Sequence, residues 1–278
     1  MGIETTFVDT TRYVQHEQAI RPNTQLLYLE SPTNPTLRVV DFDRTASLAK
    51  QRGILSMIDS TFGTPVNQHP SEHGIGLVMH SGTKYLAGHS DLICGVVAGR
   101  QELIDRIWAT RTILGTCMDP HASWMLVRGL KTLPVRVARQ NENAQRVAEF
   151  LSDHAKVRSV NYPFLKCHPQ YEVARRQMSG GGGMVSFEVE GTGEDARRVT
   201  EAMRLFTLAP SLGSVESLVS IPVLTSHAMI AAEERAKMGV TEQLIRLSVG
   251  IENVDDLIAD LEHALEAVAA PQRVPVGN

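Results

Sequence analysis

A lysine follows a short apolar run and stands next to two hydroxyl side chains. Leu77–Met79 has the composition of a buried strand, and Ser81, Thr83 and Lys84 come directly after it within the stretch His80–His89. A lysine whose pKa is lowered can form a Schiff base with an aldehyde, and hydroxyl groups beside it can bind phosphate oxygens. The stretch therefore suits a ligand that carries both groups, although by itself it fits a solvated loop lysine better.

A carboxylate ends another apolar run. Asp59 directly follows Ile54–Ile58, where a bare carboxylate is costly unless it is paired. A pyridinium nitrogen is a suitable partner, and pyridoxal 5'-phosphate (PLP) combines such a ring with an aldehyde and a phosphate. Asp59 alone fits a helix cap or a turn. Together with Lys84 after the next strand, it favours a PLP site.

An arginine interrupts a third apolar run. Arg246 lies within Leu244–Ser248, and a buried guanidinium needs an anionic partner, for which a carboxylate is well suited. That partner is either a structural acidic residue or the α-carboxylate of an amino-acid substrate, and the pattern leaves both open. The ten histidines show no paired ligand spacing, so no metal site is expected.

Alternating strand and helix patterns determine where these side chains lie. They predict an α/β fold with a mainly parallel sheet covered by helices. Such sheets bind ligands beyond the carboxyl ends of their strands, and Asn34, Asp59 and Lys84 all come after strands. Strands are expected at 5–9, 26–29, 54–58, 77–79 and 95–98, with one helix ending near residue 52 and another over 101–109.

The second half of the sequence predicts a smaller α/β domain. Pro134 indicates a break between helices at 120–130 and 135–154, which places the boundary between a PLP-binding domain (1–135) and a C-terminal domain (136–278). Asn253 is positioned to cap the last helix. Further strands are expected at 157–160, 184–189 and 244–248, and a helix at 194–203.

Composition and charge exclude several classes of protein. With 42% apolar and 21% charged residues and a net charge of −4, the chain resembles an ordinary globular protein and has no electrostatic footprint for nucleic acid. It has no apolar run of membrane-spanning length, and Met1–Thr5 shows no basic region followed by an apolar core, so no secretion signal is expected. Three widely spaced cysteines fit a reducing compartment. We therefore expect a cytoplasmic protein without a membrane or nucleic-acid partner.

Six segments, in this order, resemble the Cys/Met-metabolism family of PLP enzymes. The family includes cystathionine γ-synthase, cystathionine γ-lyase, methionine γ-lyase and the homoserine-ester sulfhydrylases. The resemblance covers nearly the whole chain. It is carried by Glu30–Thr36, Ile58–Pro65, His80–Asp91, Trp124–Asn143, Ser211–Leu218 and Arg246–Glu252.

The resemblance implies a fold and a set of cofactor-binding residues. The fold is the aspartate-aminotransferase-like fold, type I of the PLP enzymes, in a homotetramer built as a dimer of dimers. Lys84 would hold PLP as a Schiff base and move protons during the reaction. Asp59 would pair with the pyridine nitrogen, Ser81 and Thr83 would bind the phosphate, and Asn34 would lie near the ring hydroxyl.

The resemblance also implies an amino-acid substrate and a trans-sulfuration reaction. Asn34, Ser211 and Arg246 would orient the substrate α-carboxylate. Some γ-lyases have a glutamate immediately before the serine that matches Ser211, whereas this chain has Pro210. This difference favours γ-replacement on an activated homoserine ester with cysteine, as in cystathionine γ-synthase. γ-Elimination by a cystathionine or methionine γ-lyase stays open, as does a non-catalytic fragment or pseudo-enzyme subunit.

The family carries a further segment before the position that matches Met1. That segment contains a tyrosine that stacks on the PLP ring and residues that reach the phosphate of a neighbouring subunit. We therefore expect the sequence to lack the family's N-terminal third, or another chain to supply it.

Overall fold

The computed structural model describes residues 2–9 and 11–268, which form two compact units. The first unit consists of Met1–Asn34, Arg38–Pro134 and Pro169–Gly180. The second consists of Pro35–Leu37, Val135–His168 and Gly181–Asn278. The main division between the units falls at residues 134 and 135, but each unit also contains one short segment from the other side of that boundary. The division into two domains at residue 135 stays a prediction.

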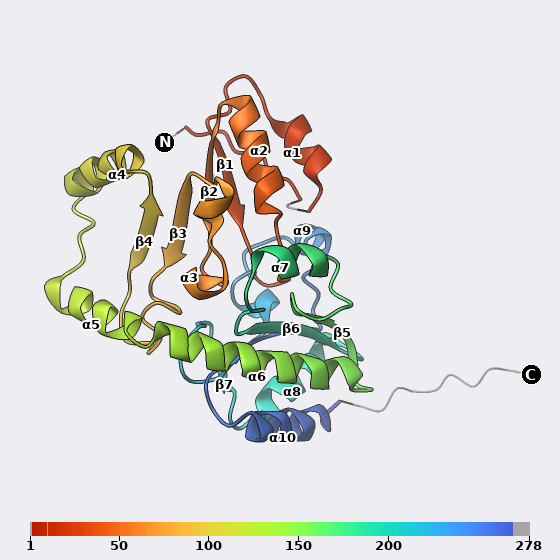
Figure 1. Cartoon of the computed structure of the whole chain (residues 1–278). Coiled ribbons are helices and arrows are strands. Elements are labelled where there is room, and N and C mark those ends of the chain that lie inside the picture. Colours follow the sequence, from red (N-terminus) through yellow and green to blue (C-terminus); the bar gives the residue numbers. More distant parts are fainter. Residues whose placement is uncertain (1, 10, 269–278) are drawn as a thin grey trace, which may run out of the picture. The chain divides into compact units, whose positions relative to one another are not determined.

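A four-stranded sheet organises the first unit (Figure 1). Its strands, in spatial order, are β1 (Leu26–Glu30), β2 (Leu55–Asp59), β3 (Leu77–Ser81) and β4 (Gly95–Gly99). The first three run parallel and β4 is antiparallel to β3. The carboxyl ends of β1, β2 and β3 therefore share one edge, and Asn34, Asp59 and Lys84 come at or just after those ends.

Helix α2 (Phe42–Arg52) makes the crossover from β1 to β2 and covers one face of this sheet. Its N-cap is Asp41, whose carboxylate accepts the Arg44 N–H, and its C-cap is Gly53, which has a φ of 65°. Alternation along the strands turns one set of apolar side chains towards this helix. The resulting core contains Leu29, Val40, Phe42, Ala46, Ile58, Ile75 and Val78.

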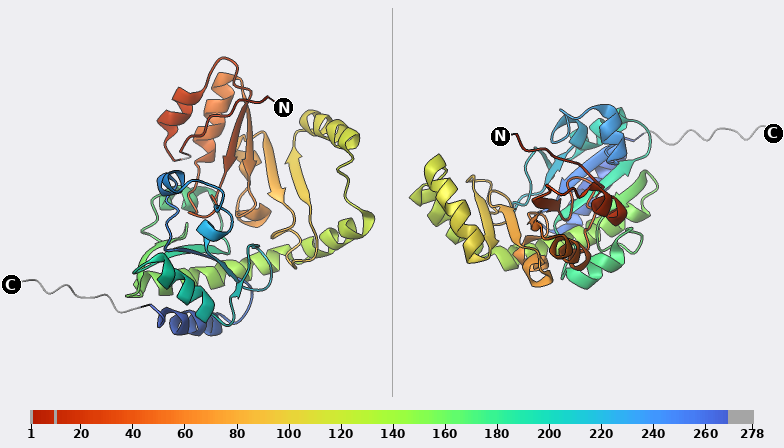
Figure 2. Two further views of the ribbon diagram at one scale, coloured as in Figure 1. Left: turned by 180° about the vertical axis from the view of Figure 1, so that it is seen from behind. Right: turned by 90° about the horizontal axis from the view of Figure 1, so that it is seen from above.

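The remaining helices of the first unit lie around the sheet (Figure 2). α4 (Gln101–Leu114) contacts the edge strand β4, and α5 (Pro120–Leu130) follows it. The Gln177 side chain at the end of α7 (Tyr171–Gln177) donates to Val40 O and accepts the Phe42 N–H, so α7 is tied to the start of α2. The other helical segments are α1 (Tyr13–Ala19), α3 (Thr64–Asn67) and η1 (Pro70–His73).

A five-stranded sheet organises the second unit, and its neighbours are antiparallel except for one parallel pair. In spatial order its strands are β5 (Val157–Asn161), β6 (Met184–Val189), β9 (Leu244–Ser248), β8 (Leu218–Ser220) and β7 (Thr207–Leu208). One apolar core joins the sheet to α6 (Leu133–Asp153), α8 (Gly193–Ala202) and α10 (Val254–Leu265). The shorter segments are η2 (Pro222–Leu224) and α9 (Ala232–Lys237).

Most predicted elements form, and three details differ. The expected strand at 5–9 pairs with no other strand within the described residues, and Phe7 on it is 94% exposed. Pro134 does not separate two helices. It lies in the first turn of α6, where a missing N–H costs nothing, so the break falls at residues 131–132. The helix expected over 101–109 continues to Leu114. In the part of the chain described, no helix has the length and apolarity needed to cross a membrane.

Candidate active site

The Asp59 carboxylate at the end of β2 is fixed by the turn that follows it. Its Oδ1 accepts the Thr61 N–H at 2.9 Å and the Thr61 hydroxyl at 2.5 Å. The same hydroxyl accepts the backbone N–H of Ser81 at 2.8 Å, which ties the turn to the end of β3. These hydrogen bonds hold the Asp59 carboxylate in place. Because Asp59 is only half-buried, its carboxylate is still accessible to a ligand.

A second carboxyl group, that of Glu30, ends the neighbouring strand. Glu30 is in register with Asp59, and the next residue, Ser31, donates its N–H to Asp59 O at 3.2 Å. Glu30 Oε1 accepts the Asn34 N–H at 2.9 Å and so holds the turn that carries Asn34. Burial raises the pKa of Glu30 to about 7, helped by the charge of Asp59 and opposed by the Asn34 N–H.

The lysine loop, residues 82–88, follows β3, and its residues 82–87 form consecutive turns. The backbone N–H of Lys84 donates to Ser81 O at 3.1 Å, and the backbone carbonyl of Lys84 accepts the Gly88 N–H at 2.8 Å. The Thr83 hydroxyl accepts the Cys94 N–H at 3.0 Å and donates to Cys94 O at 3.3 Å, which fixes the loop to the residue before β4. The predicted contacts of Ser81 and Thr83 with phosphate stay predictions.

Helix α5 packs closely against the same loop. A Cβ atom added to Gly129 would lie 2.4 Å from Ala87 O and 3.0 Å from Leu86 O. Tyr85, Leu86 and Ala87 are buried in the loop. Because only hydrogen fits at residue 129, this glycine sets the distance between α5 and the chain segment that carries the lysine.

Arg246 lies at the centre of the sheet of the second unit and is 2% exposed. Its register neighbours are Ser186 on β6 and Ser220 on β8, two small buried residues. Arg246 Nη2 donates to Pro210 O at 3.1 Å and to Ser211 O at 3.3 Å. The arginine thus positions the loop that contains Ser211.

Buried amides of α6 hold the loops on either side of Arg246. Gln140 Nε2 donates to Ser214 O at 2.8 Å, and Asn143 Nδ2 donates to Gly250 O at 3.0 Å and to Glu252 O at 2.9 Å. The Glu252 carboxylate then accepts both the N–H and the hydroxyl of Ser217. The two loops are therefore joined to one helix and to each other.

The charge of Arg246 also acts on a nearby histidine. Burial lowers the pKa of His227, and the positive charges of Arg246 and Arg235 lower it further. His227 is therefore neutral at pH 7, so it adds no charge beside the arginine.

The predicted site residues fall into two groups. Asn34, Asp59, Ser81, Thr83 and Lys84 belong to the first unit, where β1, β2 and β3 bring them to one sheet edge. Ser211 and Arg246 belong to the second unit, where a direct contact links them. The first group fits the chemistry of PLP, since it offers an amine for the aldehyde, a carboxylate for the ring nitrogen and hydroxyl groups for the phosphate.

Sequence reasoning gave no role to Thr61 or Glu30. A signal for Glu30 was present, because it is a carboxylate directly after the apolar run Leu26–Leu29, which is the same observation that singled out Asp59. Thr61 gave no such signal. A threonine two residues after a strand is common in turns, and its link to Ser81 depends on the pairing of β2 with β3.

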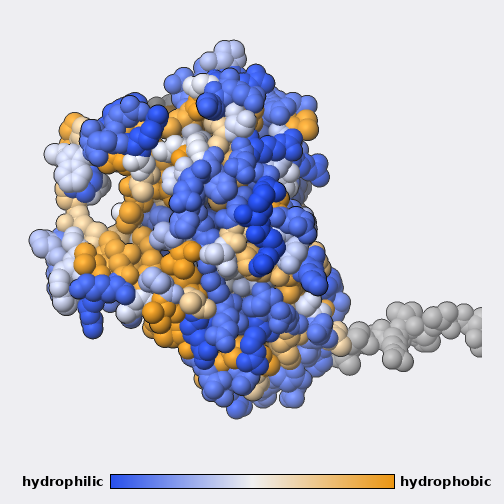
Figure 3. Space-filling view, in the orientation of Figure 1, coloured by the Kyte–Doolittle hydropathy of each residue, from blue (hydrophilic) through white to orange (hydrophobic). Residues whose placement is uncertain are grey.

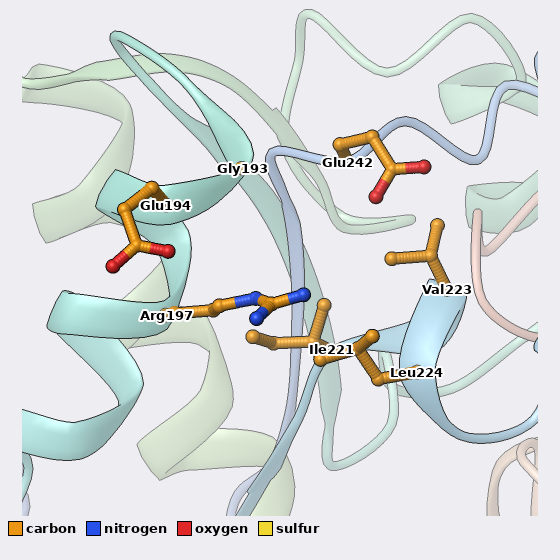
Figure 4. Close-up of a pocket in the computed structure, with 7 residues that line it drawn as sticks. All are labelled: Gly193, Glu194, Arg197, Ile221, Val223, Leu224 and Glu242. Atoms are coloured by element: carbon orange, nitrogen blue, oxygen red, sulfur yellow. The ribbon is translucent and has the colours of Figure 1, made fainter.

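A pocket of about 310 Å³ lies elsewhere in the second unit, and no predicted site residue lines it. Figure 4 shows Arg197 reaching from α8 into this pocket towards Ile221 and Leu224, with Glu242 at another side. Among the described residues, no three histidine, cysteine, aspartate or glutamate side chains are grouped so that they could hold a metal ion.

Comparison with known proteins gives a consistent set of relatives. A model of the family described as Cys/Met metabolism PLP-dependent enzyme matches residues 1–266. The chain is 44% identical to a cystathionine gamma-lyase of Bacillus subtilis over 96% of its own length and 71% of the relative's. It is 42% identical to an L-methionine gamma-lyase of Fusobacterium nucleatum (96% and 68%). It is 44% identical to a cystathionine beta-lyase of Coxiella burnetii (95% and 69%).

A solved structure shows the same fold. The crystal structure of cystathionine gamma-lyase from Lactobacillus plantarum, complexed with L-serine, superimposes with a TM-score of 0.92 at 40% identity. The match covers 95% of this chain and 69% of that one. The predicted type I PLP-enzyme fold is therefore confirmed.

Proposed function

Since the chain belongs to the Cys/Met metabolism family of PLP-dependent enzymes, we propose that it acts as a lyase on a carbon–sulfur bond of an amino acid. The observation that carries this proposal is that the three relatives above, matched over nearly the whole chain, are lyases of cystathionine or methionine. The activity favoured from the sequence, γ-replacement, takes second place.

The cofactor is PLP, which when bound supplies an electron sink for the bonds at the substrate α-carbon. In this proposal Lys84 Nζ would hold the cofactor, and the Asp59 carboxylate would pair with the ring nitrogen. Ser81 and Thr83 would bind the phosphate. Once displaced, the Lys84 amine takes the proton from the substrate α-carbon and returns it to another atom of the substrate.

Arg246 is the proposed partner of the substrate α-carboxylate, together with Asn34 and Ser211. A guanidinium binds a carboxylate through two parallel hydrogen bonds, which fixes the orientation of the substrate as well as its charge. The contacts of Arg246 Nη2 with Pro210 O and Ser211 O support this role, because they hold the arginine in one position before substrate arrives.

γ-Replacement is kept as a second candidate because of Pro210. This residue is exposed and offers no carboxylate at the position immediately before Ser211. It therefore supplies no negative charge to attract the distal ammonium group of a substrate such as cystathionine. A homoserine ester lacks that ammonium group, so this feature favours the replacement reaction over the cleavage of cystathionine.

Product analysis tests both candidates. The PLP-loaded protein is given cystathionine alone, methionine alone, or O-succinylhomoserine with cysteine. A lyase produces a 2-oxo acid and ammonia from one of the first two, and the thiol released from cystathionine shows which carbon–sulfur bond was cleaved. Formation of cystathionine from the third mixture alone would favour replacement, and a protein without turnover of any substrate would contradict both.

The variant Lys84→Ala tests the role of this lysine in the site. We expect it to abolish turnover and the visible absorbance of the bound cofactor, whereas Lys50→Ala, an exposed lysine on α2, keeps both. Retention of the absorbance by Lys84→Ala would contradict the role given to this lysine.

We also infer that the protein forms a homo-oligomer. Large apolar side chains are exposed on α4 and α5, namely Trp108, Ile113, Leu114, Trp124 and Val127. Figure 3 shows hydrophobic surface around α5. Exposed apolar surface of this kind marks a site of protein–protein contact, and a second copy of this chain bound there would remove these side chains from water. Sedimentation of Val127→Glu should give a smaller species than wild type, with Val14→Glu on α1 as the control; equal sizes would contradict this interface.

The cytoplasmic location stays a prediction.

A further inference from the structure

Two carboxyl groups end neighbouring parallel strands of the first unit, at the sheet edge that also carries Lys84. Glu30 and Asp59 are in register, and neighbouring strands lie about 4.8 Å apart. Side chains in register in a parallel pair point to the same face of the sheet. Two negative charges at the ends of neighbouring strands disfavour each other, so one of the two carboxyl groups keeps its proton to a higher pH.

The hydrogen bonds of the two groups differ. Asp59 Oδ1 accepts two hydrogen bonds from Thr61, and such donors stabilise a carboxylate. Glu30 accepts the Asn34 N–H, a bond that a neutral carboxyl oxygen can also accept. Asp59 therefore receives more hydrogen-bond donors to a negative charge than Glu30 does.

The groups around the pair are consistent with a proton on Glu30. Electrostatic interactions couple Glu30 to Asp59 on β2 and to Tyr28 on its own strand, and they couple Asp59 to His80 on β3. Burial raises the pKa of Tyr28 and lowers that of His80, so both are neutral near pH 7. Burial and the charge of Asp59 raise the pKa of Glu30 to about 7.

We propose that Glu30 is a positioning residue of the cofactor site, which holds the Asn34 turn beside Asp59 and does so as a neutral carboxylic acid. The inference rests on the proposed roles of Asp59 and Asn34 at the cofactor. As a neutral group, Glu30 keeps its bond to the Asn34 amide without repelling the carboxylate that faces the ring nitrogen. When Glu30 loses its proton, the second charge pushes the two strand ends apart and loosens the Asn34 turn.

Infrared spectroscopy of the cofactor-free full chain tests the protonation state directly. The carboxylic-acid C=O band of wild type at pH 6 should be lost with a midpoint near pH 7, and Glu30→Gln should lack this component. The matched control Glu17→Gln, an exposed residue on α1, should retain it. Asp59→Asn should move the midpoint to lower pH because it removes the neighbouring charge. Identical titrations of wild type and Glu30→Gln would overturn the inference.

Cofactor affinity, measured by absorbance titration of the full chain with PLP, tests the positioning role. Glu30→Gln keeps an oxygen acceptor and is always neutral, so it should bind PLP within about threefold of wild type at pH 6.5 and more tightly than wild type at pH 8.5. Glu30→Ala removes the acceptor and should weaken binding by about tenfold or more at both pH values. Equal affinities of wild type, Glu30→Gln and Glu30→Ala would overturn the positioning role.

The two measurements separate this inference from the proposed lyase. If the protein cleaves no sulfur-containing amino acid, the proposed activity fails while the infrared titration still decides whether Glu30 is the protonated member of the pair. If the protein is an active lyase and the titration shows no Glu30 component, this inference alone fails.

Discussion

The backbone N–H of Ser81 donates to the side-chain hydroxyl of Thr61 at 2.8 Å. One hydroxyl therefore joins the end of β3 to the turn after β2, while its own proton goes to the Asp59 carboxylate. A hydroxyl group can donate once and accept at the same time, so both bonds form together. The Thr61 side chain thus links Asp59, proposed to pair with the ring nitrogen, to Ser81, proposed to bind the phosphate.

Thr61→Val should weaken PLP binding by about tenfold, because it leaves the Ser81 N–H and Asp59 each without one partner, a loss of about 1–2 kcal/mol. Titration of the protein with PLP measures this effect. Thr61→Ser retains the hydroxyl and should bind like wild type. If the valine variant also binds like wild type, the link through Thr61 has no role at the cofactor.

Gly129→Ala should destabilise the fold by about 1–3 kcal/mol, because the new methyl group meets the carbonyl oxygens of Ala87 and Leu86. Helix propensity alone predicts a gain of about 1 kcal/mol for the same change, so the sign of the effect identifies its cause. Urea unfolding measures it. Gly95→Ala, where no atom lies within 4 Å of the added Cβ, is the control. A stabilised Gly129→Ala variant would contradict the close packing.

Arg246→Lys should raise KM by about 10- to 100-fold and change kcat less, because an ammonium group cannot form the two parallel hydrogen bonds of a guanidinium. Steady-state kinetics with the substrate found by product analysis separates the two constants. Arg146→Lys, an exposed residue paired with Asp255, should change neither. A loss confined to kcat would argue against α-carboxylate binding by Arg246.

His168 should make the fold sensitive to acid. Burial lowers the pKa of His168 to about 4 from the ordinary 6.5, although a backbone hydrogen bond with Leu37 opposes this shift. The unfolded chain takes up a proton near pH 6.5, whereas the folded chain does so only near pH 4. The stability contributed by the neutral ring is therefore present above pH 6.5 and is lost as the pH falls through this window, by up to about 3 kcal/mol.

Urea unfolding at several pH values between 4 and 7.5 tests the prediction for His168. His168→Gln should reduce the loss of stability on acidification, and His263→Gln, an exposed histidine on α10, should not. Parallel pH profiles for wild type and His168→Gln would contradict the assignment.

Local signals made much of the fold and part of the site predictable. Apolar runs followed by Pro, Gly or polar residues gave β1, β2, β3 and β9, and the expected cap of α10 forms, with Asn253 Oδ1 accepting the Asp255 N–H at 2.8 Å. Asp59 and Lys84 were found because a charged group after an apolar strand conflicts with its surroundings unless it has a partner.

Features that depend on contacts between distant segments were not predictable from the sequence. The register that puts Glu30 beside Asp59, and the serines that flank Arg246, follow from strand pairing and not from spacing. The exchange of short segments between the two units is a property of tertiary contacts as well. Pro134 was misinterpreted because a proline fits equally well between helices and in the first turn of one.

The parallel register of β1 and β2 has a consequence for insertions and deletions in this region. Side chains alternate between the two faces of the sheet, so one residue added within Leu55–Ile58 would turn the Asp59 carboxylate towards α2 and bring an apolar side chain to the place that Asp59 now occupies. The same insertion between the strands would only lengthen a connection. Length variation in this unit is thus tolerable in its loops and disruptive within its strands, and two-residue changes in the strands should be less harmful than one-residue changes.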